Sequence, residues 1–152
     1  MKSLNKLAQE GKINEHASIR DSHSIIINAS IDNVWKILTD IDHWNSWNNT
    51  VKTTKLEGNL VEGSFFDWRQ GRNQIKSQIQ LLKKPTSFAW TSESKWVKRI
   101  SVWSLVSDEN QTIATVSTSL QGPMVVIVEN HQKIYDELLN WLECLKSEAE
   151  EV

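Results

Sequence analysis

The sequence predicts an α+β domain in which an antiparallel sheet packs against one long helix near the C-terminus. Seven extended segments are rich in β-branched and aromatic residues. Turn residues join the last six of these segments, and no helical pattern interrupts that run. Because parallel neighbours need connections of roughly a dozen residues or more, this order favours antiparallel pairing. One amphipathic helical pattern then follows the strands.

The first part of the chain predicts little regular structure. Leu4 and Leu7 have helical spacing, but Gly11 interrupts the pattern. Residues 1–16 are therefore expected to form a short, loosely attached helix or tail. A single domain is expected over residues 17–150, because the chain has room for only one core of common size.

Two short helices are expected after the first strand, which lies within residues 17–28. Ser30 is a suitable N-cap for a helix that runs to about Thr39, since its hydroxyl can accept from a free backbone N–H. The second helical turn places Trp44 and Trp47 three residues apart, on one side.

The remaining six strands follow one another as a series of hairpins. Gly, Pro, Asn and Asp residues mark the turns between them. The expected strands span residues 50–56, 64–70, 74–83, 88–92, 97–106 and 112–120. In the last strand the alternation fits either of two inward faces: Ala114, Val116, Thr118 and Leu120, or Thr115, Ser117 and Ser119.

The longest regular segment begins after Gly122 and Pro123 and predicts an amphipathic helix. Its apolar stripe needs a partner, and the concave face of the sheet is the only one large enough. The stripe consists of Ile127, His131, Ile134, Leu138, Trp141 or Leu142, and Leu145. The polar residues Glu129, Lys133, Glu137, Asn140 and Glu143 fall elsewhere on the helix.

Composition excludes several classes of protein. The net charge of −2 and a charged fraction of 24% give no basic field for nucleic acid and no signature of disorder. No window approaches the roughly 18 apolar residues of a membrane span, and the N-terminus lacks the apolar core of a signal peptide. The single cysteine, Cys144, cannot form an internal disulfide, so a reducing cytoplasm is expected. Eight tryptophans either fill the core or border a cavity.

Several local strings resemble one superfamily. They are IDNVWKILTD (31–40), HWNSWN (43–48), GSFFDW (63–68), FAWT (88–91), VW (102–103), GP (122–123) and WLECLK (141–146). Over about residues 17–148 the chain resembles the SRPBCC superfamily. Within it, the chain resembles the polyketide cyclase/dehydrase group, which includes START-like lipid-transfer domains and relatives of the major birch pollen allergen.

The resemblance implies the helix-grip fold. In this fold a seven-stranded antiparallel curved sheet wraps round a long C-terminal helix, two short helices follow strand 1, and the gap between sheet and helix is the pocket. The superfamily hosts cyclases, lipid carriers, hormone receptors and stress-response regulators on this scaffold, so the resemblance is specific for fold and weak for function.

The chain departs from the family pattern at positions that bear on catalysis. Many relatives carry a histidine two residues before the strand tryptophan, where this chain has Ser101, and acidic residues in the last strand, where it has Ser117 and Thr118. Any catalytic role of those groups in relatives is therefore doubtful here. The expected pocket offers hydroxyls and amides instead of strong acids and bases.

Strand alternation and the helix stripe predict the residues that contact a ligand. They are Phe66, Trp68, Ile75, Ser77, Ile79, Phe88, Trp90, Ser92, Ser101, Trp103, Met124, Ile127, His131 and Tyr135. His131 is the only one that exchanges protons near neutral pH, so it is the candidate general acid or base, with Tyr135 as an auxiliary donor. The simpler alternatives are that these side chains fill a core and that His131 is structural.

No pattern predicts a metal or a cofactor. The four histidines and the cysteine lack the close spacing of a metal-ligand set, and no glycine-rich phosphate loop or nucleophile elbow occurs. Asp67 and Arg69 share the face opposite Trp68 and are expected to be solvated. No two carboxylates converge on a predicted inner face, which argues against hydrolase chemistry.

The leading hypothesis is a cytoplasmic carrier or sensor that binds a small hydrophobic molecule, whether lipid, aromatic or polyketide-like, as a monomer or homodimer. The first alternative is a cyclase- or dehydratase-like enzyme in which His131 moves a proton. The second is a protein-interaction module that uses Trp44 and Trp47 as an exposed patch, although these residues are also expected to cover one end of the pocket. The sequence leaves the ligand's identity and the choice between binding and catalysis open.

Overall fold

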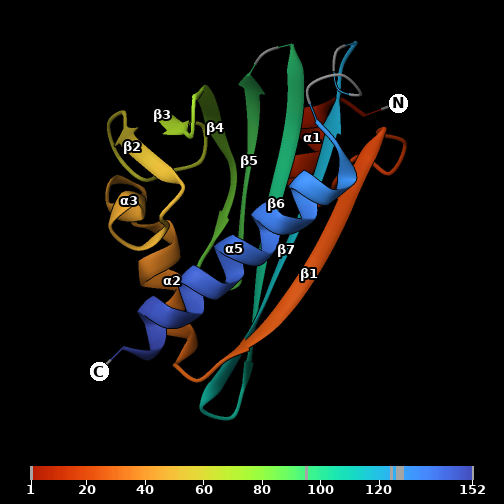
Figure 1. Ribbon diagram of the computed structural model, residues 1–152. Helices are drawn as coiled ribbons and strands as arrows, with labels where there is room; N and C mark the ends of the chain where they lie inside the picture. Colours follow the sequence, from red (N-terminus) through yellow and green to blue (C-terminus); the bar gives the residue numbers. More distant parts are fainter. Residues whose placement is uncertain (1, 95, 124, 126–128, 152) are drawn as a thin grey trace.

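A seven-stranded antiparallel sheet curves around a long C-terminal helix in the computed structural model, which describes residues 2–94, 96–123, 125 and 129–151 (Figure 1). The strands are β1 (Ile19–Ile27), β2 (Val51–Leu56), β3 (Phe65–Gln70), β4 (Asn73–Lys83), β5 (Ser87–Ser94), β6 (Val97–Asp108) and β7 (Gln111–Gln121). Their order in the sheet is β1-β7-β6-β5-β4-β3-β2, so all neighbours except β1 and β7 are consecutive in the chain. The predicted fold class and helix-grip arrangement are confirmed.

The short helices after β1 form as predicted. Helix α2 (Ile31–Thr39) is followed by the 3₁₀ turn η1 (Ile41–His43) and by α3 (Trp44–Trp47). Ser30 is the N-cap of α2, and its hydroxyl accepts a hydrogen bond of 3.2 Å from the backbone N–H of Asn33. In Figure 1 these helices lie at one end of α5, where they close that end of the sheet.

Helix α5 (His131–Glu150) crosses the concave face of the sheet, but it begins later than predicted (Figure 1). The side chain of Asn130 caps it by accepting from the N–H of Lys133 at 2.8 Å. Most residues between Pro123 and this cap lie outside the described residues. The buried side of α5 is formed by Ile134, Leu138, Trp141, Leu142, Leu145 and Ala149.

Gly122 follows the last strand and is required by its surroundings. Its φ of +134° is rare for residues with a side chain. A Cβ at this position would also collide with the backbone carbonyl oxygen of Trp96. The chain can therefore leave β7 beside the β5–β6 turn only with glycine here.

The N-terminal helix α1 (Leu4–Gln9) packs on the outer face of the sheet, which corrects the expectation of a loose attachment. Ala8 is fully buried in a second apolar cluster with Ala89, Ile100 and Val102. Ala89 lies on β5 and the other two on β6, so α1 covers the middle of the sheet. Helix α1 packs here because the outward-facing side chains of Ala89, Ile100 and Val102 are apolar.

The inward face of β7 is the one that contains Ala114, Val116, Thr118 and Leu120, all of which are buried. The opposite face pairs hydroxyls with β1: Ser117 Oγ lies 2.8 Å from Ser22 Oγ, and Thr115 Oγ1 lies 2.7 Å from Ser24 Oγ. Cross-strand packing thus decides which face of β7 points inward, a choice that alternation left open.

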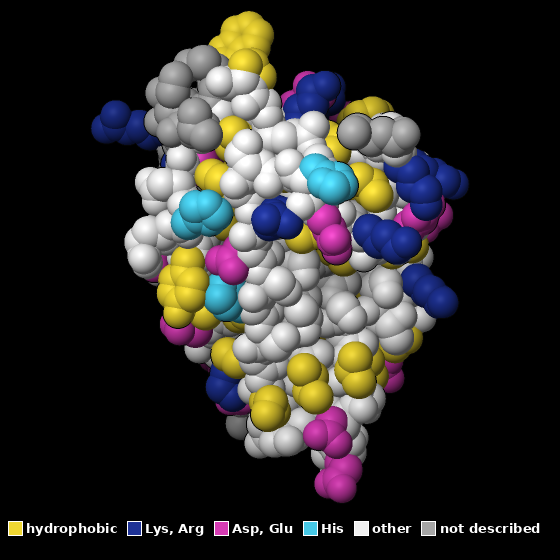
Figure 2. All heavy atoms as spheres, turned by 90° about the vertical axis from the view of Figure 1, so that its right-hand side faces the viewer, with side chains coloured by type: hydrophobic (Ala, Val, Ile, Leu, Met, Phe, Trp, Pro, Cys, Tyr) yellow, Lys and Arg dark blue, Asp and Glu magenta, His cyan; other side chains and the backbone are white. Residues whose placement is uncertain are grey.

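Viewed from the side of β1, few charged side chains appear on the lower half of the molecule (Figure 2).

Candidate functional site

Tryptophans fill much of the space between the sheet and α5. Trp44 is fully buried, and its indole N–H donates to the carbonyl oxygen of Leu38 at 2.9 Å. Its ring centroid lies 5.1–5.4 Å from those of Phe66, Trp68, Trp90 and Trp141. These distances are within the range of favourable aromatic pairs, about 4.5–7 Å. The α2–α3 end of the interior is therefore a packed aromatic core.

A cavity of about 70 Å³ remains beside this core, under the N-terminal half of α5. Four indoles form part of its wall, and polar and charged groups from β6 and α5 form another part. Its lining residues are Trp68, Gln70, Asn73, Ile75, Trp90, Ser92, Ser94, Val97, Arg99, Ser101, Trp103, Val116, Leu120, Glu129, Lys133, Glu137, Leu138 and Trp141. Because about 10–15 Å³ of such space is enough to hold one water, the cavity is small but larger than a single water site.

Strand alternation and register build the cavity wall. Arg99, Ser101 and Trp103 share the concave face of β6, since every second side chain of a strand points the same way. The register places Trp90 opposite Ser101 and Ser92 opposite Arg99 on the neighbouring strands. Residues from β5 and β6 therefore meet at one place on the sheet.

Serine hydroxyl groups form hydrogen bonds with some of the polar atoms in this wall. The indole N–H of Trp68 donates to Ser77 Oγ at 3.0 Å, and Ser77 Oγ lies 2.7 Å from Ser92 Oγ. The indole N–H of Trp90 is buried and has no hydrogen-bond partner in the described part of the chain. A buried donor without a partner costs free energy.

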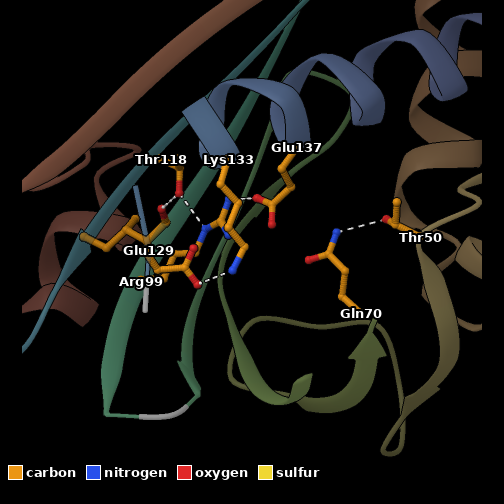
Figure 3. Close-up of polar contacts among 8 residues, drawn as sticks. Thr50, Gln70, Arg99, Thr118, Glu129, Lys133 and Glu137 are labelled. Carbon is orange, nitrogen blue, oxygen red and sulfur yellow. Dashed lines mark hydrogen bonds and ion pairs between the residues drawn. The ribbon is translucent and has the colours of Figure 1, made fainter. Parts of the chain in front are cut away.

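Four charged residues, Arg99, Glu129, Lys133 and Glu137, line the cavity beneath α5, and we call them the charged rim (Figure 3). Arg99 pairs with Glu137, and both side chains are only 18% exposed. The Nε–H of Arg99 also donates to Thr118 Oγ1 at 2.7 Å. Lys133 Nζ lies 3.3 Å from a carboxylate oxygen of Glu129. The rim therefore carries two cations and two carboxylates.

The opposite side of the cavity is uncharged. The side-chain amide of Gln70 donates to Thr50 Oγ1 at 3.1 Å, which links the end of β3 to the chain just before β2 (Figure 3). Gln70 and Asn73 both line the cavity here, at the two ends of the β3–β4 turn. The cavity thus has a charged side and an amide side around its indole wall.

The sequence profile of one family, described as "Polyketide cyclase / dehydrase and lipid transport", matches residues 18–143. The chain belongs to this family. No curated protein sequence matches the chain significantly. The profile covers the whole sheet and most of α5, so the cavity lies entirely within the family's domain.

Solved structures share the family's fold at low sequence identity. A START superfamily protein from Mycobacterium smegmatis has a TM-score of 0.73 at 16% identity, covering 86% of this chain and 97% of that one. The protein Ara h 8.0201 has a TM-score of 0.70 at 12% identity, and the match covers 86% of this chain and 96% of that one. The Zhui aromatase/cyclase from a Streptomyces species has a TM-score of 0.70 at 14% identity, and the match covers 86% of this chain and 93% of that one. Similarity at this level shows the fold alone.

The structure brings six of the predicted ligand-contact residues of this family member to the cavity: Trp68, Ile75, Trp90, Ser92, Ser101 and Trp103. Phe66, Ile79 and Phe88 are buried in the core and do not line it. Ser77 is buried behind the wall and supports Trp68 and Ser92. Met124 and Ile127 lie outside the described residues.

His131 and Tyr135 do not reach this cavity. His131 is the first residue of α5 and is exposed, so the helical spacing that placed it on the apolar stripe does not bury it. Ile134 is the first buried residue of that helix. Tyr135 is 42% exposed, and its ring packs edge-on against His23 with centroids 4.8 Å apart. Neither side chain is placed to exchange a proton with a molecule in the cavity.

The charged rim was not predicted from the sequence. Arg99 has the same parity as Ser101 and Trp103, so alternation alone could have placed it on the inner face. Glu129, Lys133 and Glu137 follow one another at intervals of four, and the last two lie on one side of α5. They belong to the predicted polar face of the helix, and in the structure this face adjoins the cavity.

Among residues 2–94, 96–123, 125 and 129–151, no three His, Cys, Asp or Glu side chains come together as a metal site would require. Within the same residues, no helix combines the length and apolar character needed to cross a membrane.

Proposed function

We propose that this chain binds a small hydrophobic molecule in the cavity between the sheet and α5, as a carrier or sensor. The observation that supports this most directly is the partly enclosed cavity with four indoles in its wall. Rigid aromatic walls with a few polar groups are typical of small-molecule sites. Membership of a family described by cyclase and lipid-transport activities agrees with such a site.

The size of the cavity favours a compact ligand. At about 70 Å³ it is far smaller than typical ligand pockets, which run from about 300 to 1,000 Å³. A long lipid or a folded polyketide would have to displace the aromatic core around Trp44. A single-ring molecule needs only small movements of the side chains beside the cavity. We therefore propose an aromatic ligand of about one ring.

The enzyme alternative as predicted from the sequence relied on His131, which is exposed and does not line the cavity. The interaction alternative needs Trp44 and Trp47 to be exposed. Trp44 is buried, and the ring of Trp47 packs against that of Trp141 with centroids 5.6 Å apart. Binding without chemistry is therefore the function that the geometry supports best.

A neutral one-ring probe tests the proposal. We expect 4-fluorotoluene, followed by ¹⁹F NMR, to bind the protein in a saturable way. The variant Ser101→Leu adds apolar bulk to the concave face beside Trp103 and should abolish this binding by filling the cavity. The control Ser104→Leu makes the same change on the opposite face of β6 and should bind normally. Equal binding by both variants would place the probe elsewhere and contradict the proposal.

A further inference from the structure

Arg99 is a cation whose side chain points into the concave face of the sheet. It lies on β6 between Val97 and Ser101, and all three line the cavity. Its side chain is only 18% exposed. Arginine remains charged at any physiological pH, so a permanent positive charge lies in the cavity wall.

The hydrogen-bonding capacity of this guanidinium is only partly used. Nε donates to Thr118 Oγ1, and Nη2 donates to a carboxylate oxygen of Glu137. Thr118 in turn donates its hydroxyl proton to the carbonyl oxygen of Ile100 at 2.8 Å, which orients the oxygen that Arg99 uses. A guanidinium has five N–H groups. The N–H groups of Nη1 have no partner in the described part of the chain.

Trp90 lies beside this guanidinium in the cavity wall. Its side chain is 3% exposed and lines the cavity. On the register, Trp90 lies opposite Ser101, two residues from Arg99 on β6. Arg99 therefore has donors left over next to an indole wall, and a ligand that supplies both acceptors and a ring would match this part of the cavity.

We propose that the ligand is an aromatic acid, and that Arg99 binds its carboxylate while the indoles pack against its ring. This inference rests on the proposed function. A carboxylate matches the planar fork of a guanidinium, and charge-assisted hydrogen bonds of this kind are the stronger ones. A ligand amine would instead enter beside the cations Arg99 and Lys133. Glu137, the carboxylate that already pairs with Arg99, comes from α5 and competes with the ligand acid.

Three probes with the same ring test separately whether the cavity binds a ligand and whether Arg99 binds a carboxylate. They are 4-fluorobenzoate, 4-fluorobenzamide and 4-fluorotoluene, each titrated by ¹⁹F NMR. They differ only in a carboxylate, a neutral amide or a methyl group. We expect the acid to bind roughly tenfold more tightly than the amide, because a charge-assisted hydrogen bond is about twice as strong as a neutral one. The preference should weaken as salt is added.

Variants assign the preference to Arg99. In Arg99→Gln the acid and amide should bind equally within about twofold, because the guanidinium that makes the charge-assisted hydrogen bond is gone. Glu137→Gln removes the competing carboxylate and should strengthen binding of the acid severalfold over the parent protein. Arg72→Gln removes an arginine from the exposed β3–β4 turn and should change nothing. Circular dichroism checks that each variant is folded. If Arg99→Gln unfolds, the acid-to-amide affinity ratio of the parent protein and the affinity of Glu137→Gln for the acid still test the role of Arg99.

The outcomes distinguish two failures. If none of the three probes binds the parent protein, the proposed function itself fails. If 4-fluorotoluene binds but the acid binds no better than the amide, the cavity is a ligand site and the role of Arg99 is refuted. A preference for the acid that persists in folded Arg99→Gln would likewise overturn the assignment to this residue.

Discussion

Replacing Trp44 by alanine should destabilise the protein more than any surface change. The side chain is fully buried and its ring contacts four other aromatic rings. Truncating a buried tryptophan to alanine costs about 3–5 kcal/mol through lost transfer free energy and the cavity that remains. The variant also leaves the carbonyl oxygen of Leu38 without its indole donor.

We expect Trp44→Ala to fall at the upper end of that range, near 5 kcal/mol, because aromatic pairs add about 0.5–1.5 kcal/mol each beyond their buried area. For a chain of 152 residues each kcal/mol lowers Tm by about 2–4 °C, so Tm should fall by about 10–20 °C. Urea unfolding followed by far-UV circular dichroism measures the free energy directly.

Trp96→Ala is the matched control for this measurement. Trp96 is 79% exposed at the β5–β6 turn, so its truncation should change the free energy of unfolding by no more than about 0.5 kcal/mol. A loss in Trp44→Ala of less than about 1 kcal/mol, or one similar to that of the control, would refute the view that the aromatic core is closely packed. Trp44→Phe, which keeps a ring, should lie between the two.

Three further predictions concern the ends of secondary elements. Ser30→Ala removes the N-cap of α2 and should cost about 1 kcal/mol in urea unfolding, whereas Ser30→Asp should restore most of it. Gly122→Ala should lower Tm clearly, because its Cβ would meet the carbonyl oxygen of Trp96; an unchanged Tm would contradict that contact. The hydrogen bond from Lys146 lowers the pKa of Glu150 below its ordinary value. The ionised carboxylate thus stabilises the fold above its unfolded-state pKa, and this contribution disappears as pH falls through the folded-state pKa. The difference in Tm between the parent and Glu150→Gln should therefore shrink on acidification, and a constant difference would argue against the pairing.

The fold was predictable because periodicity is local. Alternation located each strand, the cap at Ser30 located α2, and apolar spacing located the buried side of α5. The start of that helix was not predictable in the same way. His131 continues the stripe by spacing, but burial depends on whether another element covers the position, and that is a property of the assembled sheet.

The candidate site was predictable in part for the same reason. Parity placed Trp68, Trp90 and Trp103 on one inner face, and in the structure all three line the same cavity. Arg99 has the same parity and was overlooked, since charged strand residues are more often solvated. Whether tryptophans fill a core or border a cavity depends on how rings from distant elements meet, and here they do both.

The aromatic core also gives the protein a built-in optical signal. Indoles whose centroids lie 5–6 Å apart can exchange excitation energy, so we expect Trp44, Trp68, Trp90 and Trp141 to emit as a coupled group shielded from water. Trp96 is 79% exposed, so we expect it to emit at longer wavelength. Occupancy of the cavity would alter the first emission and leave the second as an internal reference. The unlabelled protein can thus report on its own interior.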